Sequence, residues 1–122
     1  MPCEILVLED ETLIAMDIEM SLQAQGFDGI VVCHSSDAAL DQIARDPPRA
    51  ALLDVNLGSN TTSLPVASEL RGRKIPFAFL TGYSDRTFDI PENLYDVERI
   101  SKPFDEAALS NRIAAMLQDD DG

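Results

Sequence analysis

One stretch near the N-terminus decides the fold: Ile5-Leu6-Val7-Leu8-Glu9-Asp10-Glu11. Four apolar residues in a row, without the alternation of a half-exposed strand, are typical of a strand covered on both faces, as in parallel sheets. Three acids follow at once, where the chain leaves the strand. Residues 11–25 then carry Ile14, Ile18 and Leu22 at helical spacing, so the pattern predicts a helix directly after the acids.

The rest of the chain repeats this alternation of strand and helix. Apolar runs predict further strands over residues 29–33, 50–53, 77–80 and 97–101. Helical spacing and capping residues predict helices from Ser35 to just before Pro47, over about 65–71, and from an Asp105 cap through Leu117, with an irregular stretch over 83–97. This alternation predicts an α/β fold, a doubly wound sheet of parallel strands with helices on both faces, the fourth helix being short or irregular. We take the flavodoxin-like (βα)5 arrangement, with the strands in the order 2-1-3-4-5, as the expected one.

Length and composition indicate one domain. The 122 residues fit a single domain, with a core over about 4–117 and an acidic tail over 118–122. A net charge of −13 disfavours binding to nucleic acid or to an anionic membrane surface. Since neither a signal peptide nor an apolar stretch of ~20 residues is present, we expect a cytoplasmic protein. Cys3 and Cys33 are expected to be semi-buried thiols rather than metal ligands or a disulfide.

Polar side chains follow four of the predicted strands. They are Glu9 and Asp10 after the first strand, Asp54 after the third, Thr81 after the fourth and Lys102 after the fifth. Parallel sheets bind ligands outside the carboxyl ends of their strands. In the order 2-1-3-4-5 these side chains would converge on one pocket. The second strand would lie at the edge, and His34 after it is expected to be exposed and away from the pocket.

Three neighbouring carboxylates would repel one another, and a divalent cation removes that repulsion. An all-oxygen set of this kind suits Mg²⁺. Beside the metal, Asp54 could attack a phosphoryl group and carry it as an acyl phosphate, with Lys102 and Thr81 binding the phosphoryl oxygens. Each residue also has an ordinary role: Asp10 could cap the first helix, Asp54 and Thr81 could begin turns, and Lys102 could be a solvated charge. Their joint occurrence favours phosphoryl chemistry.

Four short motifs carry a family resemblance: residues 5–11, Leu52-Leu53-Asp54-Val55-Asn56, Leu80-Thr81-Gly82 and Ser101-Lys102-Pro103-Phe104. In this order and spacing they resemble the receiver domain of response regulators in two-component signalling. The resemblance implies that Asp54 is the phosphoacceptor of a signalling protein, not the catalyst of an enzyme. It also implies Mg²⁺ ligation by Asp10, Asp54 and the backbone carbonyl of Asn56, with Glu9 acting through water, and phosphoryl binding by Thr81, Gly82 and Lys102.

The stretch Pro76-Phe77-Ala78-Phe79-Leu80-Thr81-Gly82-Tyr83 resembles the variant receivers called the "FAT GUY" group, which often occur as stand-alone domains. This implies, as partner, a histidine kinase (the HWE type is one candidate) or a histidine phosphotransfer protein, and a monomer or weak dimer. Two positions depart from the ordinary receiver pattern: Gly58 replaces a proline, and Arg99 replaces the switch aromatic. Tyr83 is a candidate for part of the switch or for a cover over the site mouth.

Three other functions suit a chain of this fold. A haloacid-dehalogenase-like enzyme also phosphorylates an aspartate after a strand, but it needs a second acid where this chain has Asn56. A flavodoxin-like electron carrier needs a phosphate-cradling loop where this chain has Glu9-Asp10-Glu11. A pseudo-receiver would bind partners without phosphorylation, which the complete set of site residues disfavours.

Overall fold

The computed structural model of the chain describes residues 3–55, 57, 62–82, 92–94, 96–101 and 105–121, the last three by their backbone alone. Its strands form one sheet: β1 Ile5–Leu8, β2 Ile30–Cys33, β3 Ala50–Asp54, β4 Phe77–Thr81 and β5 Arg99–Ser101. The strand order is β2-β1-β3-β4-β5, and all neighbouring strands are parallel. The predicted fold class and strand order are therefore confirmed.

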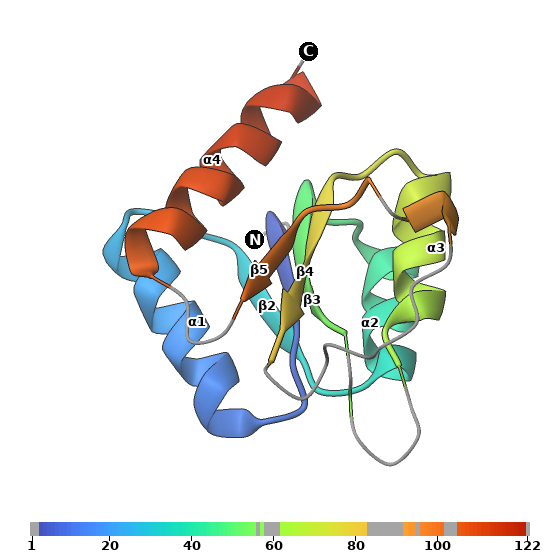
Figure 1. Ribbon diagram of the computed structural model, residues 1–122, viewed down its shortest axis with the longest axis horizontal. Helices are drawn as coiled ribbons and strands as arrows, with labels where there is room; N and C mark the ends of the chain where they lie inside the picture. Colours follow the sequence, from blue (N-terminus) through green and yellow to red (C-terminus); the bar gives the residue numbers. More distant parts are fainter. Residues whose placement is uncertain are drawn as a thin grey trace.

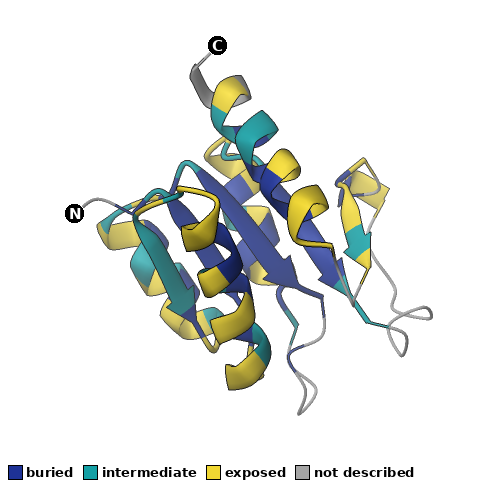
Figure 2. Cartoon of the chain, turned by 90° about the vertical axis from the view of Figure 1, so that its left-hand side faces the viewer, coloured by how far each residue is buried: buried dark blue, intermediate teal, exposed yellow. Residues whose placement is uncertain are grey.

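Helices cover both faces of the sheet (Figure 1). Helices α1 (Thr12–Ala24) and α4 (Glu106–Asp121) lie on one face, and α2 (Ser36–Arg45) and α3 (Leu64–Gly72) lie on the other. Side chains alternate along β1: Ile5 and Val7 join the core layer under α1 and α4, and Leu6 and Leu8 join the layer under α2 and α3. Both sets are fully buried, which explains the unbroken apolar run in the sequence (Figure 2).

Helix starts follow the capping residues in two cases. The Ser35 side chain caps α2 by accepting a hydrogen bond from the Ala38 N–H at 3.1 Å. The Asp105 carboxylate accepts one from the Ala107 N–H at 3.4 Å at the start of α4. The N-cap of α1 is Glu11, without a side-chain cap. Asp10 is therefore not the cap of α1, and that alternative role for its carboxylate is ruled out.

The element ends differ from the predictions in two places. Strand β5 begins at Arg99 rather than at residue 97. Helix α4 continues to Asp121, so the predicted acidic tail over 118–122 is helical as far as residue 121. Within the irregular stretch 83–97, Glu92–Leu94 form the 3-10 helix η2, while 83–91 and 95 lie outside the described residues.

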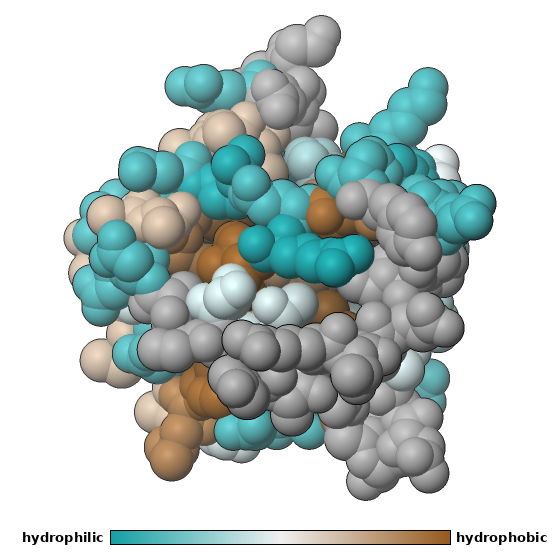
Figure 3. Space-filling view, viewed as in Figure 1, coloured by the Kyte–Doolittle hydropathy of each residue, from teal (hydrophilic) through white to brown (hydrophobic). Residues whose placement is uncertain are grey.

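Helix α1 presents a stripe of apolar side chains to solvent. Leu13, Met16 and Met20 are exposed and lie on one side of the helix, at spacings of three and four residues. Figure 3 shows hydrophobic surface at lower left, where α1 lies in the same view of Figure 1. None of the described helices is both long enough and apolar enough to cross a lipid bilayer.

Candidate metal and phosphoryl site

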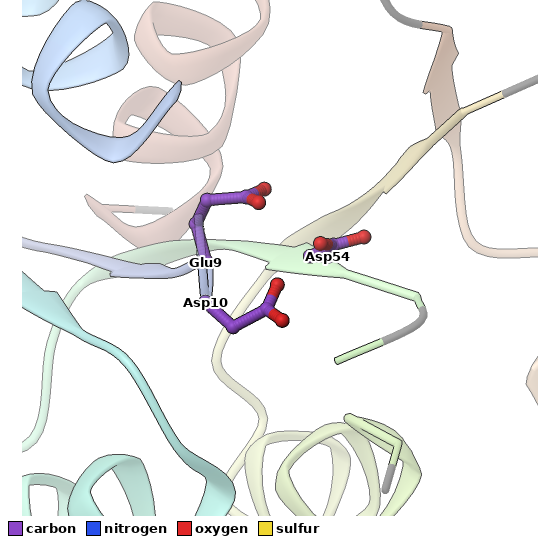
Figure 4. Close-up of side chains that lie close together, drawn as sticks. All are labelled: Glu9, Asp10 and Asp54. Atoms are coloured by element: carbon purple, nitrogen blue, oxygen red, sulfur yellow. The ribbon is translucent and has the colours of Figure 1, made fainter. Parts of the chain in front are cut away.

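The end of β1 holds Glu9 in a fully buried position. Its backbone N–H donates to the Cys33 carbonyl of β2 at 3.0 Å, so the strand pairing carries on one residue beyond β1. The Glu9 carboxylate accepts a hydrogen bond from the Glu11 N–H at 3.3 Å. This contact orients the Glu9 carboxylate. The next residue, Asp10, is more exposed than Glu9, and its carboxylate lies on the side of Asp54 (Figure 4).

The end of β3 holds Asp54, whose side chain is also nearly buried, with 3% exposed. Strand β3 lies between β1 and β4: Leu8 is in register with Leu53, and Asp54 is in register with Leu80. The Val55 N–H donates to the Leu80 carbonyl at 3.1 Å, so β3 stays attached to β4 past its last residue. Asp54 is thereby placed between the acids of β1 and the end of β4.

The carboxylates of Glu9, Asp10 and Asp54 meet at this edge of the sheet (Figure 4). One oxygen of each lies within 4.8 Å of an oxygen of the others. Like charges this close repel one another, a bound cation relieves that repulsion, and carboxylate oxygens are the ligands that Mg²⁺ prefers. The donor set therefore fits Mg²⁺, with the more exposed Asp10 on the solvent side and the buried Asp54 beside β4.

The end of β4 supplies a hydroxyl beside this cluster. Thr81 is the last residue of β4, half-buried, and in register with Ser101 of β5. Gly82, also half-buried, follows it. Because Leu80 pairs with Asp54, Thr81 lies one residue beyond the carboxylate on the neighbouring strand. A hydroxyl there can donate a hydrogen bond to an anion held at Asp54.

Not every predicted site residue can be placed. Asn56, Tyr83 and Lys102 lie outside the described residues, so their predicted roles stay predictions. Arg99 is the exposed first residue of β5, in register with Phe79. It therefore lies two residues before the carboxyl end of the strand.

The prediction for His34 is wrong in one respect. The side chain is exposed, as expected, but it is not remote from the acids: its Nδ1–H donates to the Glu9 carbonyl at 3.0 Å. A carbonyl can only accept, so Nδ1 carries the proton. The reason is the strand order itself, since β2 pairs with β1 and Leu8 is in register with Cys33. Two neighbouring parallel strands bring the residues after their carboxyl ends close together. The predicted strand order, with the second strand beside the first, already implied that His34 lies near Glu9.

The two thiols form no disulfide, as predicted, but both are buried rather than semi-buried. Burial, with a further contribution from the Asp46 carboxylate, raises the pKa of Cys3 to about 11. Burial likewise raises the pKa of Cys33. Both thiols are therefore protonated at neutral pH, when a metal ligand or nucleophile would need to be a thiolate.

Comparison with known proteins agrees with this geometry. The family model of the response regulator receiver domain matches residues 5–114. The solution structure of SdrG from Sphingomonas melonis Fr1 is 35% identical, with a TM-score of 0.80, over 95% of this chain and 97% of that one. The phyllosphere-induced regulator PhyR of Methylorubrum extorquens is 34% identical over 96% of this chain.

Other similar proteins widen the same picture. The response regulator MprA of Mycobacterium tuberculosis is 31% identical over 97% of this chain. This chain covers 44% of PhyR and 52% of MprA, so it spans about half the length of the curated relatives it matches. The NtrX receiver domain from Brucella abortus, at 23% identity and a TM-score of 0.81, supports the fold. The chain belongs to the response regulator receiver domain family of two-component systems.

Proposed function

We propose that this chain accepts a phosphoryl group on Asp54 from a phosphohistidine, with Mg²⁺ at the carboxylate cluster. The observation that carries the proposal is the meeting of Glu9, Asp10 and Asp54 at the carboxyl ends of β1 and β3. Bound Mg²⁺ would neutralise charge on the phosphoryl oxygens. Asp10 and Asp54 would hold it directly, with Glu9 acting through water and the Asn56 carbonyl as a further ligand.

Asp54 is the best acceptor of the three acids because of its strand. Only β3 is flanked both by the acid-bearing β1 and by β4 with its terminal hydroxyl. Glu9 is fully buried, and its carboxylate accepts the Glu11 N–H, so it suits a supporting role. In the transfer, an Asp54 oxygen bonds to phosphorus as the donor P–N bond breaks, and the imidazole nitrogen keeps the electron pair. Thr81, Gly82 and Lys102 would bind the phosphoryl oxygens.

The partners follow from the chemistry and from the relatives. A phosphohistidine donor means a histidine kinase, with the HWE type as a candidate, or a histidine phosphotransfer protein. The similarity to SdrG, over 95% of this chain, supports a receiver that signals by contact or phosphotransfer in the cytoplasm. A similar protein, PhyR of Bartonella quintana, is described as an anti-anti-sigma factor, and this chain covers 51% of it. Relay toward such a regulator is the setting we propose.

Intact-protein mass spectrometry tests the acceptor. Wild type incubated with acetyl phosphate and Mg²⁺ should gain the mass of one phosphoryl group, and EDTA should prevent the gain. Asp54→Asn should gain nothing, whereas the matched control Asp17→Asn, on the exposed side of α1, should behave as wild type.

Two results would contradict the proposal. If Asp54→Asn is labelled as fully as wild type, another residue is the acceptor. If wild type is never labelled and does not bind beryllofluoride with Mg²⁺, the chain is a phosphorylation-independent interaction module instead.

A further inference from the structure

A hollow of about 470 Å³ lies at the end of the sheet opposite the carboxylates. It forms where the end of α3, the start of β4 and the connection into β5 meet (Figure 1). Its apolar lining comes from Ile75, Pro76, Phe77 and Val97. Phe77 begins β4 and Thr81 ends it, so about 13 Å of strand, four steps of ~3.3 Å, separate the hollow from the phosphoryl site.

Around the hollow, two carboxylates form ion pairs with arginines, and one lysine forms none among the described residues. Asp96 accepts two hydrogen bonds from the Arg71 guanidinium, at 3.0 and 3.2 Å. Glu98 forms an ion pair with Arg112 of α4. Lys74, which is exposed at the rim, forms no ion pair with any residue in the described ranges. In a chain of net charge −13, this hollow therefore offers an uncompensated positive charge beside an apolar lining.

The backbone of Lys74 is in a conformation that costs stability. Its φ is 62°, and it is the sole non-glycine residue with positive φ among the described residues. The position ends α3 in a Schellman motif: the Ile75 N–H donates to the Leu70 carbonyl at 2.9 Å, and the Lys74 N–H donates to the Arg71 carbonyl at 3.1 Å. Glycine is the usual residue there. A lysine at such a position, where glycine would cost less, points to a role for its side chain.

We propose that the hollow is a docking site for a segment of a partner protein that presents an aromatic side chain next to one carboxylate. The aromatic group would lie against Phe77 and Val97, and the carboxylate would pair with the Lys74 ammonium. The volume is within the range of sites that bury a bulky group. The Arg71 guanidinium, 6.0 Å from the Phe77 ring centroid and hydrogen-bonded to Asp96, borders the hollow on one side.

This site is independent of phosphorylation chemistry. It shares no residue with the carboxylate cluster, and it lies at the amino end of β4 rather than the carboxyl end. A phosphodonor at one end of the sheet therefore leaves the hollow accessible at the other. The domain would bind two proteins at once, with the second held whether or not Asp54 can be modified.

The absence of tryptophan from the chain permits a direct binding test. The probe is the capped peptide acetyl-Gly-Trp-Glu-Gly-amide, whose tryptophan anisotropy reports only the peptide. Wild type should bind it saturably, and Asp54→Ala should bind it equally well. Lys74→Gly should weaken binding about two- to fivefold, as expected for an exposed ion pair, while Lys74→Arg should retain it. Arg45→Gln, which removes a cation on α2 away from the hollow, is the matched control.

A second peptide with glutamine in place of glutamate completes a double-mutant cycle. The affinity of the glutamine peptide for wild type should equal the affinity of the glutamate peptide for Lys74→Gly. The substitution Lys74→Gly should not weaken binding of the glutamine peptide any further. When the glutamate peptide is titrated into the protein, the changes in NMR amide chemical shift should be largest for residues 71–77 and 96–98. No saturable binding to wild type, equal affinity for Lys74→Gly, or shifts centred elsewhere would each overturn the proposal. Misfolding cannot imitate the expected loss, because glycine suits this backbone position better than lysine.

Discussion

Replacing Lys74 with glycine is expected to make the folded domain more stable. An L-residue in the left-handed region costs roughly 1–2 kcal/mol, and Lys74 lies there with φ 62°. Glycine avoids this cost, but it adds roughly 0.5–1 kcal/mol of backbone entropy to the unfolded chain. The lysine side chain is exposed and without an ion pair among the described residues, so its removal forfeits no native contact of that kind. The free energy of unfolding should rise by about 0.5–1 kcal/mol.

The expected change in melting temperature follows from chain length. Unfolding entropy is roughly 2.1 cal/mol/K per residue. For 122 residues this gives about 0.26 kcal/mol/K. Dividing the expected increase in the free energy of unfolding by this unfolding entropy predicts a rise in Tm of about 2–4 °C.

Urea denaturation followed by circular dichroism measures the gain. Lys74→Ala is the matched control, because it removes the same charge and stem but keeps a Cβ, and it should gain nothing. Gly26→Ala is the converse control. Gly26 has φ 95°, and a Cβ added there would meet no atom within 4 Å, so any loss must come from the backbone conformation. If Lys74→Gly is no more stable than Lys74→Ala, the assignment of strain to Lys74 is wrong.

Three further outcomes are expected. Mg²⁺ at a hundredfold excess over its Kd should raise the free energy of unfolding by about 2.7 kcal/mol in wild type and by less in Asp10→Asn, measured by urea denaturation. Since the folded pKa of Cys3 is raised from 9.0 to about 11, the unfolded thiol ionises first as pH rises, and wild type should lose stability relative to Cys3→Ala across that interval. The Arg71 guanidinium lowers the pKa of the Asp96 carboxyl, so wild type should lose stability relative to Asp96→Asn as pH falls below 3.8, and Arg71→Gln should abolish the difference.

Much of the acid cluster could be predicted because its signals are local. An apolar run that ends in an acid identifies both a buried strand and the residue at its carboxyl end. This holds for Glu9 and Asp10 after β1 and for Asp54 at the end of β3. Parallel pairing then brings these ends together whatever the loops do. The contact of His34 with the Glu9 carbonyl followed from the same pairing, and the error was to treat an edge strand as a distant one.

Element ends were harder to predict because packing decides them. Strand β5 starts at Arg99 because the pairing with β4 begins where Arg99 meets Phe79, although the apolar Val97 suggests an earlier start. Helix α4 runs to Asp121 although three aspartates at a helix C-terminus oppose the helix dipole. The apolar residues at helical spacing end at Leu117, and nothing in the sequence of the three aspartates that follow predicts a helix.

By itself, the sequence predicted the alternation of strands and helices, the two-sided core and the carboxylates of the site, since each depends on residues adjacent in the chain. The strand order was an expectation that the strand pairing in the structure established. Only the tertiary structure decided the hollow around Lys74. Its lining comes from residues 71–77 and 96–98, which the start of β4 and the connection into β5 bring together. Nothing in the sequence marks Lys74 as left-handed, because that conformation is imposed by the Schellman bonds to Arg71 and Leu70. Local sequence patterns report the conformation that a residue prefers. Whether the Lys74 ammonium has an ion-pair partner depends on residues distant in the sequence, because Asp96 pairs with Arg71 and Glu98 pairs with Arg112.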